Sequence, residues 1–256
     1  MGCGNSSIAP APSSAIEGGV VSLAASDREA AARVIGNAFA GTPTAAPEWA
    51  WHWVMGPSMS DRAEPQRAAT MQYMHGWNIF ATSGAHILGI RAPDGALQAV
   101  VVCWKSPGGA KGVGTSVCGA LSYISKDFDG THNPLPLYMK SRKLIDKRLN
   151  ALIKAQKAMK QEHAAGPHLY ISAVAVDPSA QGTKLGSKLM AAVAAMADAD
   201  GLPCYTEVSG STRDVYAHLG YEEQAVYTVS IAGDEAEHAP FGELYAMVRP
   251  PKGASR

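Results

Sequence analysis

The chain has 256 residues and a formal net charge of zero, with 46% hydrophobic and 17% charged residues. This balance is typical of a globular protein and excludes a largely disordered one. A neutral chain also gives no reason to expect nucleic acid as a partner. The length favours a single core, so we expect one folded domain over residues 18–250, preceded by a flexible tail at residues 1–17.

The cysteines give no sign of a metal site. None belongs to a C-x-x-C pair or has a histidine at zinc-ligand spacing, so we expect no metal and reduced inner thiols. The four are Cys3, Cys103, Cys118 and Cys204. The sequence also has no apolar run of membrane-spanning length and no secretion signal at its start. We therefore expect a cytoplasmic protein, either free or held at the cytoplasmic face of a membrane.

The first seven residues, Met-Gly-Cys-Gly-Asn-Ser-Ser, fit the pattern for N-myristoylation at Gly2. One myristoyl chain anchors a protein only marginally, and Cys3 offers a second site, for palmitoylation. The Pro, Ala and Ser residues that follow have the composition of a linker. The alternative is a chance match at an ordinary disordered start.

The N-terminal half predicts a strand, two helical regions and a hairpin in that order. A strand at 18–25 precedes a helix at 26–40, which Ser26 and Glu29 would open as a capping box. A second helical region at 61–83 follows a loop that contains Trp49, Trp51, His52 and Trp53. Strands at 85–90 and 96–104 flank the turn Pro-Asp-Gly, which predicts a hairpin.

The middle of the chain contains a glycine-rich segment and then a basic helix. The segment at 108–119 lacks the phosphate-loop consensus, so we interpret it as a surface connection. Residues 137–163 predict a helix with the apolar stripe Leu144, Ile145, Leu149, Leu152, Ile153 and Met159. Between residues 140 and 160 there are eight Lys or Arg residues and one Asp. This basic face is a solvated surface, or it attracts anionic lipid headgroups, or it serves a phosphate-bearing ligand.

Residues 168–198 predict a strand, a tight loop and a helix. The strand His168–Val176 ends at Asp-Pro, a loop with small residues follows, and residues 188–198 are strongly helical. A helix N-terminus offers free N–H groups and a partial positive charge to an anion. Gly182, Gly186 and Ser187 allow close approach to the backbone, while Lys184 and Lys188 add positive charge. The arrangement favours binding of a pyrophosphate.

These residues resemble the signature of the GNAT superfamily of N-acetyltransferases, Val-x-Pro-x-x-Gln/Arg-x-x-Gly-x-Gly/Ala. Here it stands from Val176 to Gly186, with Lys184 where the family usually has glycine. The strand-like 204–208 and the segment 214–221, similar to the family's Leu-Tyr-x-x-x-Gly-Phe element, continue the match. The resemblance covers about 167–229 and implies an α/β (α+β) GNAT fold, with a mixed sheet of about six to seven strands flanked by helices. Another α/β protein's βαβ unit is the alternative.

The resemblance also implies where coenzyme A binds, with a CoA-binding core at 167–230. Backbone amides of the strand would bind the pantetheine arm, and the loop would hold the phosphates. The residues implied are Val174, Ala175, Val176, Gln181, Gly182, Thr183, Lys184, Leu185, Gly186, Ser187 and Ser211. Acetyl-CoA is thus the expected cosubstrate.

Two catalytic residues follow from the same comparison. Tyr216 matches the family tyrosine that protonates the departing thiolate. Many relatives carry a glutamate base on the strand, but Ser172 occupies that place here, so Glu207 on the next strand is our substitute. The aromatic cluster at 49–53 lies where relatives build the acceptor pocket.

Two functions remain open at this point. The first is transfer of an acetyl group to a primary amine, on a small molecule or a protein. The second is a membrane-tethered module that binds acyl-CoA with little turnover, which Lys184 and Ser172 make conceivable. Release of the CoA thiol in the presence of amines separates the two.

Overall fold

The structure is a computed structural model. It describes residues 15–16, 18–41, 50, 53–54, 67–68, 71–72, 84–107, 135–231 and 243–253. Several expectations lie outside these residues: the acylation sites Gly2 and Cys3, the aromatic residues Trp49, Trp51 and His52, and the glycine-rich segment. Most of the helical region at 61–83 lies outside them as well. No helix of the described ranges has the length and apolar character that crossing a membrane requires.

A mixed sheet of eight strands forms the centre of the molecule, in the order β1-β2-β3-β4-β5-β6-β8-β7. The strands are β1 Ala15–Ile16, β2 Val20–Ser22, β3 His86–Arg91, β4 Leu97–Ser106, β5 His168–Val176, β6 Cys204–Ser209, β7 Glu222–Thr228 and β8 Glu243–Arg249. Of the pairings between described strands, only that of β5 with β6 is parallel. The expected mixed sheet is confirmed, and the short β1 extends its edge by one strand.

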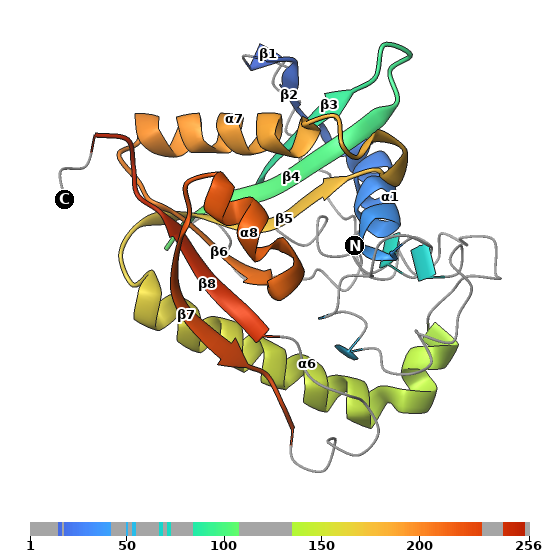
Figure 1. The fold of residues 1–256 in the computed structure, drawn as a ribbon. Coiled ribbons are helices and arrows are strands. Elements are labelled where there is room, and N and C mark those ends of the chain that lie inside the picture. The colour runs from blue at the N-terminus through green and yellow to red at the C-terminus, as the bar shows by residue number, and fades with distance from the viewer. Residues whose placement is uncertain are drawn as a thin grey trace, which may run out of the picture.

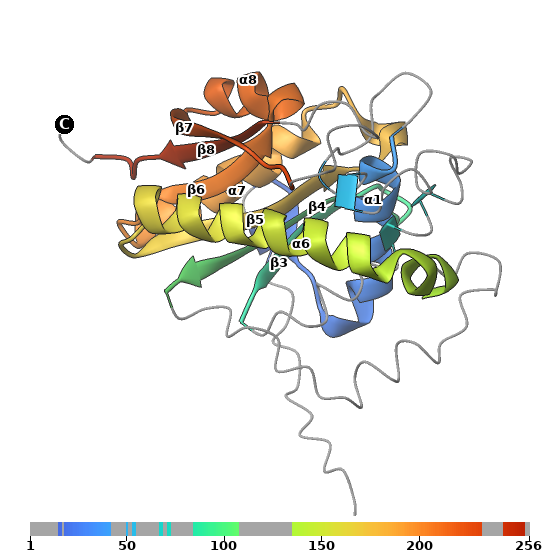
Figure 2. The same cartoon turned by 90° about the horizontal axis from the view of Figure 1, so that it is seen from below.

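Helices cover both faces of the sheet (Figure 1). They are α1 Arg28–Phe39, α6 Leu135–His163, α7 Leu185–Ala199 and α8 Gly210–His218. Side chains of β4 alternate between the faces, as a strand requires: Val100 and Val102 pack in one core with α1, while Val101 packs in another with α7. Helix α6 runs along the sheet on the side of α1, opposite α7 (Figure 2).

Helix α1 begins differently from the sequence expectation. A 3-10 turn at Ala25–Asp27 precedes it, and Asp27 is the N-cap without a side-chain capping bond. The carboxylate of Asp27 instead accepts hydrogen bonds from the backbone N–H of Ala24 at 2.9 Å and from Arg91 at 2.6 Å. The predicted capping box of Ser26 and Glu29 was therefore wrong. Asp27 is the N-cap instead, and its carboxylate binds Arg91 of β3 rather than the helix N-terminus.

Helix α6 has its expected position, but two of its residues depart from the pattern. Ile153, expected on the buried stripe, is 51% exposed, and Arg148, expected on the basic face, is fully buried. Arg148 donates a hydrogen bond to the carbonyl of Trp53 at 2.8 Å and lies over its ring. Contacts with Trp53, which is distant in sequence, thus stabilise the buried Arg148 guanidinium. Lysines 143, 147, 154 and 157 are exposed.

Candidate functional site

The loop between β5 and α7 is fixed at its start by Asp177. One carboxylate oxygen accepts hydrogen bonds from the backbone N–H of Ser179 at 3.0 Å and from its hydroxyl at 2.6 Å. The other accepts from Asn37 of α1 at 3.0 Å. Burial acts to raise the pKa of Asp177, but these hydrogen bonds outweigh it, and the pKa is lowered. The charged Asp177 therefore ties the loop to α1.

Further hydrogen bonds hold the rest of the loop. The Gln181 amide donates to the carbonyl of Val176 at 3.2 Å, and the Thr183 hydroxyl donates to the carbonyl of Ala180 at 2.5 Å. Gly182 has a φ of +79°. The side chains of Gln181, Thr183 and Lys184 are all exposed, so the loop presents polar groups to solvent.

Lys184 occupies the position where the family signature has glycine. Its φ and ψ are 64° and 17°, the left-handed conformation, and among described residues it is the one non-glycine residue with a positive φ. An L-residue there costs about 1–2 kcal/mol. Lys184 therefore has the left-handed backbone that the sequence led us to expect at this position, although it lacks glycine's freedom.

The N-terminus of α7 is open to an incoming anion. Lys184, its N-cap, makes no side-chain capping bond, and the first backbone N–H to bond within the helix is that of Lys188, at 3.1 Å to the carbonyl of Lys184. The N–H groups of Leu185, Gly186 and Ser187 are in the first turn, where an α-helix leaves them unpaired. A Cβ added at Gly186 would contact only Val176, at 3.6 Å, so the space beside the backbone is free.

Strands β5 and β6 separate after two paired residues (Figure 1). The pairs are Leu169 with Cys204 and Tyr170 with Tyr205, although β5 continues to Val176 and β6 to Ser209. The Thr206 hydroxyl donates to the carbonyl of Ile171 at 3.0 Å where the strands part. Beyond this fork, residues 174–176 pair with β4 and with no other described strand. Their edge toward β6 is left without a strand partner.

Ser172 is an extra residue in β5. Ile171 pairs with Cys103 and Ala173 with Val102, so the register between β4 and β5 shifts by one residue at Ser172. The side chain of Ser172 is exposed. Such a bulge increases the local twist, which helps β5 to diverge from its neighbour.

Helix α8 places Tyr216 close to the fork. Tyr216 is partly buried with its side chain near Thr206, and its ring contacts Tyr221 edge-on with centroids 5.3 Å apart. Burial raises the pKa of Tyr216 to about 12, although the nearby Thr206 side chain acts to lower it. The phenol therefore keeps its proton at neutral pH.

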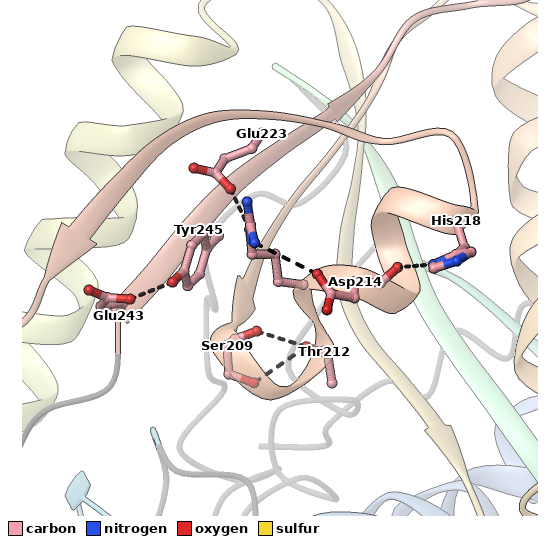
Figure 3. A network of polar contacts seen from close by, with 8 residues as sticks. Ser209, Thr212, Asp214, His218, Glu223, Glu243 and Tyr245 are labelled. Atoms are coloured by element: carbon pink, nitrogen blue, oxygen red, sulfur yellow. Dashed lines mark hydrogen bonds and ion pairs between the residues drawn. The ribbon is translucent and has the colours of Figure 1, made fainter.

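Polar contacts hold α8 against β7 and β8 (Figure 3). Arg213 donates to Glu223 of β7 at 2.5 Å, and its guanidinium lies 5.4 Å from the ring centre of Tyr245 on β8. The hydroxyl of Tyr245 in turn donates to Glu243. At the start of the helix, the Ser209 hydroxyl lies 2.9 Å from that of Ser211, a candidate CoA contact that is exposed. These contacts fix the helix that carries Tyr216.

Glu207 lies in a group of buried aromatic and charged side chains. Its Oε2 accepts a hydrogen bond from the Tyr170 hydroxyl at 2.7 Å. Its Oε1 is inaccessible to solvent and has no hydrogen-bond partner among the described residues, although the Tyr205 hydroxyl is close enough to affect its pKa. Burial raises the pKa of Glu207, whereas Tyr170 and Lys160 act to lower it. Glu207 is therefore easier to protonate than a surface glutamate.

Glu207 and Tyr216 lie on opposite faces of the sheet. Adjacent residues of a strand point to opposite faces. Glu207 bonds to Tyr170, whose ring belongs to the core beneath α6. Its neighbour Thr206 lies near Tyr216, which packs against the core beneath α7. The two candidate catalytic residues thus approach the fork from different sides.

The structure adds two residues near Glu207 that the sequence did not single out. Tyr170 is its hydrogen-bond donor, and the Lys160 Nζ lies 3.8 Å from the Tyr170 ring centre. Burial lowers the pKa of Lys160. The sequence offered one indication of this group, which is the presence of a tyrosine near the start of each of two predicted strands, at positions 170 and 205. Among the described residues, no three His, Cys, Asp or Glu side chains gather as metal ligands.

The candidate site thus combines a mixed sheet, a parallel strand pair that opens into a fork and a helix that begins beside the fork. Residues 148–223 match the family model described as an acetyltransferase (GNAT) domain. Over these residues, which are fewer than half of the chain, the protein is similar to GNAT acetyltransferases.

Solved structures of low sequence identity share the fold. A structure described as histone acetyltransferase HPA2 and related acetyltransferase, from Corynebacterium glutamicum, is 19% identical with a TM-score of 0.51, over 91% of this chain and 95% of that one. Arylalkylamine N-acetyltransferase 2 from Aedes aegypti is 14% identical with a TM-score of 0.52, over 90% and 97%. Polyamine N-acetyltransferase from Drosophila melanogaster is 13% identical with a TM-score of 0.52, over 90% and 98%. No curated protein sequence matches the chain significantly.

Proposed function

We propose that the protein transfers an acetyl group from acetyl-CoA to a primary amine by direct attack. The observation that carries this proposal is the fork, in which β5 leaves β6 after two pairs and leads to the open N-terminus of α7. Such a helix end suits a pyrophosphate, because free N–H groups and the helix dipole favour negative charge. The unpaired edge at 174–176 offers backbone groups to a pantetheine arm.

Starting from a protonated amine, the reaction forms one bond, breaks one bond and removes two protons from the nitrogen, one before attack and one after the new bond has formed. The amine nitrogen forms a bond to the acetyl carbonyl carbon, and the carbon–sulfur bond breaks so that CoA departs as a thiolate. An amine of pKa about 10.4 is mostly protonated at neutral pH and must lose a proton before it attacks. A base within hydrogen-bond reach is therefore required.

We assign the base to Glu207. Its Oε1 is without a hydrogen-bond partner among the described residues and is ready to accept a proton, while Tyr170 holds Oε2 in place. Because the pKa of Glu207 is raised, it lies closer to the pKa of the amine, and this smaller pKa difference favours proton transfer from the amine to the carboxylate. The amine then reaches the fork from the side of α6, and Tyr216 acts from the side of α7 and α8.

We assign Tyr216 to the leaving group. Its pKa of about 12 lies about 3.5 units above that of a thiol near 8.5, so complete proton transfer to the thiolate is uphill by about 5 kcal/mol. A hydrogen bond donated to the sulfur, as charge develops there, is the role that this phenol can fill. Two structural neighbours are named for amine substrates, arylalkylamines and polyamines, which is the same acceptor chemistry.

A thiol-release assay tests this proposal. Acetyl-CoA is incubated with the protein and a panel of primary amines, and free CoA thiol is measured. The proposal predicts amine-dependent release that falls at least tenfold in Tyr216→Phe and in Glu207→Gln. Binding of acetyl-CoA without release would favour the second candidate, a module that binds acyl-CoA without turnover.

We also propose a cytoplasmic location, with acylation at Gly2 and Cys3 holding the enzyme at a membrane face. The sequence pattern is its support, together with the exposed lysines of α6 at 143, 147, 154 and 157, which would add attraction to anionic headgroups.

A further inference from the structure

A cavity of about 440 Å³ lies between the C-terminal half of α6 and the edge where β4 ends and β5 begins. It is at the opposite end of β5 from the loop assigned to the CoA phosphates. The lining residues that matter here are Ile153, Lys157, Lys160, His168 and Tyr170. Ile153 faces this space, which accounts for its exposure on an otherwise buried stripe.

The lining of the cavity is basic. Lys157 and Lys160 are three residues apart on α6, so they share one face of the helix. The amides of Gln156 and Gln161 add further hydrogen-bond donors, and the described residues of the lining include no Asp or Glu. A cavity with two lysines and no carboxylate suits a ligand with a negative group and is unfavourable for a polycation.

His168 contributes a hydrogen-bond acceptor to the cavity lining. It is 2% exposed, and its Nδ1 lies 2.8 Å from the carbonyl of Gly166, which places a proton on Nδ1. In the neutral ring Nε2 is then a lone-pair acceptor. It is buried without a geometric hydrogen-bond partner among the described residues, although the Ala164 backbone is close enough to affect the pKa of His168. A buried polar atom left unpaired costs about 1–3 kcal/mol. A ligand with an N–H or O–H group would satisfy it.

The cavity adjoins the candidate base. Tyr170 lines it and also donates its hydroxyl to Glu207 at 2.7 Å. Lys160 lines it and lies against the same Tyr170 ring. A molecule seated in the cavity therefore lies one side chain away from Glu207.

From this arrangement we infer that the acceptor is an amine that also carries a carboxylate, as an amino acid does. Lys157 and Lys160 bind the carboxylate, His168 Nε2 accepts a hydrogen bond from the same molecule, and the reacting amine lies toward Glu207. The inference rests on the proposed acetyl transfer and names the substrate class for it.

Matched acceptors test the inference. Ornithine with putrescine and tyrosine with tyramine differ by one carboxylate, and tyrosine methyl ester keeps the bulk without the charge. We expect kcat/KM, measured by CoA release, to be at least tenfold higher for each carboxylated acceptor than for its counterpart without the carboxylate. The difference should come from a lower KM for the carboxylated acceptor. Higher values for putrescine, tyramine or the ester would overturn the inference while leaving acetyl transfer intact.

Variants locate the effect in the cavity. Lys157→Gln and Lys160→Gln should each lower the ratio of kcat/KM between ornithine and putrescine at least fivefold. Lys154→Gln, an exposed lysine of the same helix outside the cavity lining, should leave this ratio unchanged. Equal ratios in all four proteins would contradict the assignment. Lys157 is exposed, so its replacement keeps the test valid if Lys160→Gln fails to fold.

A binding measurement separates this inference from the proposed function. If no amine releases CoA, acetyl transfer fails, and the cavity is judged by calorimetric titration of the folded protein with ornithine and putrescine. Ornithine binding that Lys157→Gln weakens supports a carboxylate site, whereas equal or absent binding of the two compounds overturns it.

Discussion

At the scale of single residues, Lys184 combines a glycine conformation with a lysine side chain. The left-handed backbone costs about 1–2 kcal/mol, and glycine's greater freedom in the unfolded chain costs about 0.5–1 kcal/mol. We therefore expect Lys184→Gly to stabilise the protein by about 0.5–1 kcal/mol, measured by reversible denaturant unfolding.

Lys188 provides the matched control for this change. It is an exposed lysine inside α7, where glycine should destabilise by about 1 kcal/mol. Equal destabilisation by both substitutions would show that the backbone at Lys184 carries no strain.

The hydrogen bond from Tyr170 tunes Glu207. It favours the carboxylate, so its removal in Tyr170→Phe should raise the pKa of Glu207 further. A hydrogen bond to a charged group is worth about 1.5–3 kcal/mol, or about one to two pKa units. Because the base must be deprotonated to act, activity is lost as pH falls through this pKa. The acidic limb of the kcat/KM profile should therefore move to higher pH by about one unit or more.

Tyr227→Phe is the control for Tyr170→Phe. Its hydroxyl donates to the exposed Glu162 rather than to Glu207, so the profile should keep its position. An unshifted acidic limb in Tyr170→Phe would argue against Glu207 as the base.

At the scale of elements, α1 packs closely through Gly36. A Cβ at this position would lie 2.6 Å from the backbone nitrogen of Gln72 and 2.8 Å from the carbonyl oxygen of Ala68. Backbone atoms cannot rotate away, so Gly36→Ala should destabilise by about 1–3 kcal/mol despite alanine's better helix propensity.

Gly210→Ala, at the first residue of α8, is the counterpart. Its added Cβ would meet only the Tyr245 ring, at 3.6 Å, so we expect a gain of about 0.4–1 kcal/mol. Denaturant unfolding of both variants decides the point, and a neutral Gly36→Ala would refute the close contact.

How well the sequence predicted an element depended on whether local interactions define it. The expected strand at His168–Val176 has the observed bounds, because its β-prone residues and the following Asp-Pro are local signals. The predicted start of α1 was wrong because Asp27 bonds to Arg91, a residue 64 positions away. Burial of Arg148 likewise depends on Trp53, which no pattern within α6 reveals.

The candidate site divides in the same way. The loop and the N-terminus of α7 follow from contiguous residues, so their arrangement was predictable. The surroundings of Glu207 come from three elements, since Lys160 is on α6, Tyr170 on β5 and Glu207 on β6. Periodicity gives the face of a single strand but not which side chains meet across strands, so this group and the cavity beside it emerged only from the fold.

For the molecule as a whole, the proposed acylation of the tail would set its location. Dual acylation predicts that Gly2→Ala moves the protein fully to the soluble fraction of eukaryotic cells, because the myristoyl chain is absent. Cys3→Ser should leave weak, reversible membrane association, since a single chain binds with a constant on the order of 10⁴ M⁻¹. Fractionation measures both, and intact mass showing an unmodified Gly2 would end this proposal.

We propose that the loop at 181–187 and the N-terminus of α7 bind the phosphates of CoA. Gly186→Asp would place a negative side chain there, in space that the fold leaves open. Ala191→Asp adds the same charge at an exposed position farther along α7 and serves as its control.

Calorimetric titration of the folded proteins with acetyl-CoA tests this claim most directly. We expect that the wild-type protein binds, that Ala191→Asp binds within a few-fold of it, and that Gly186→Asp binds at least 100-fold more weakly. A folded wild-type protein that does not bind acetyl-CoA, or a Gly186→Asp variant that binds as the wild type does, would contradict it.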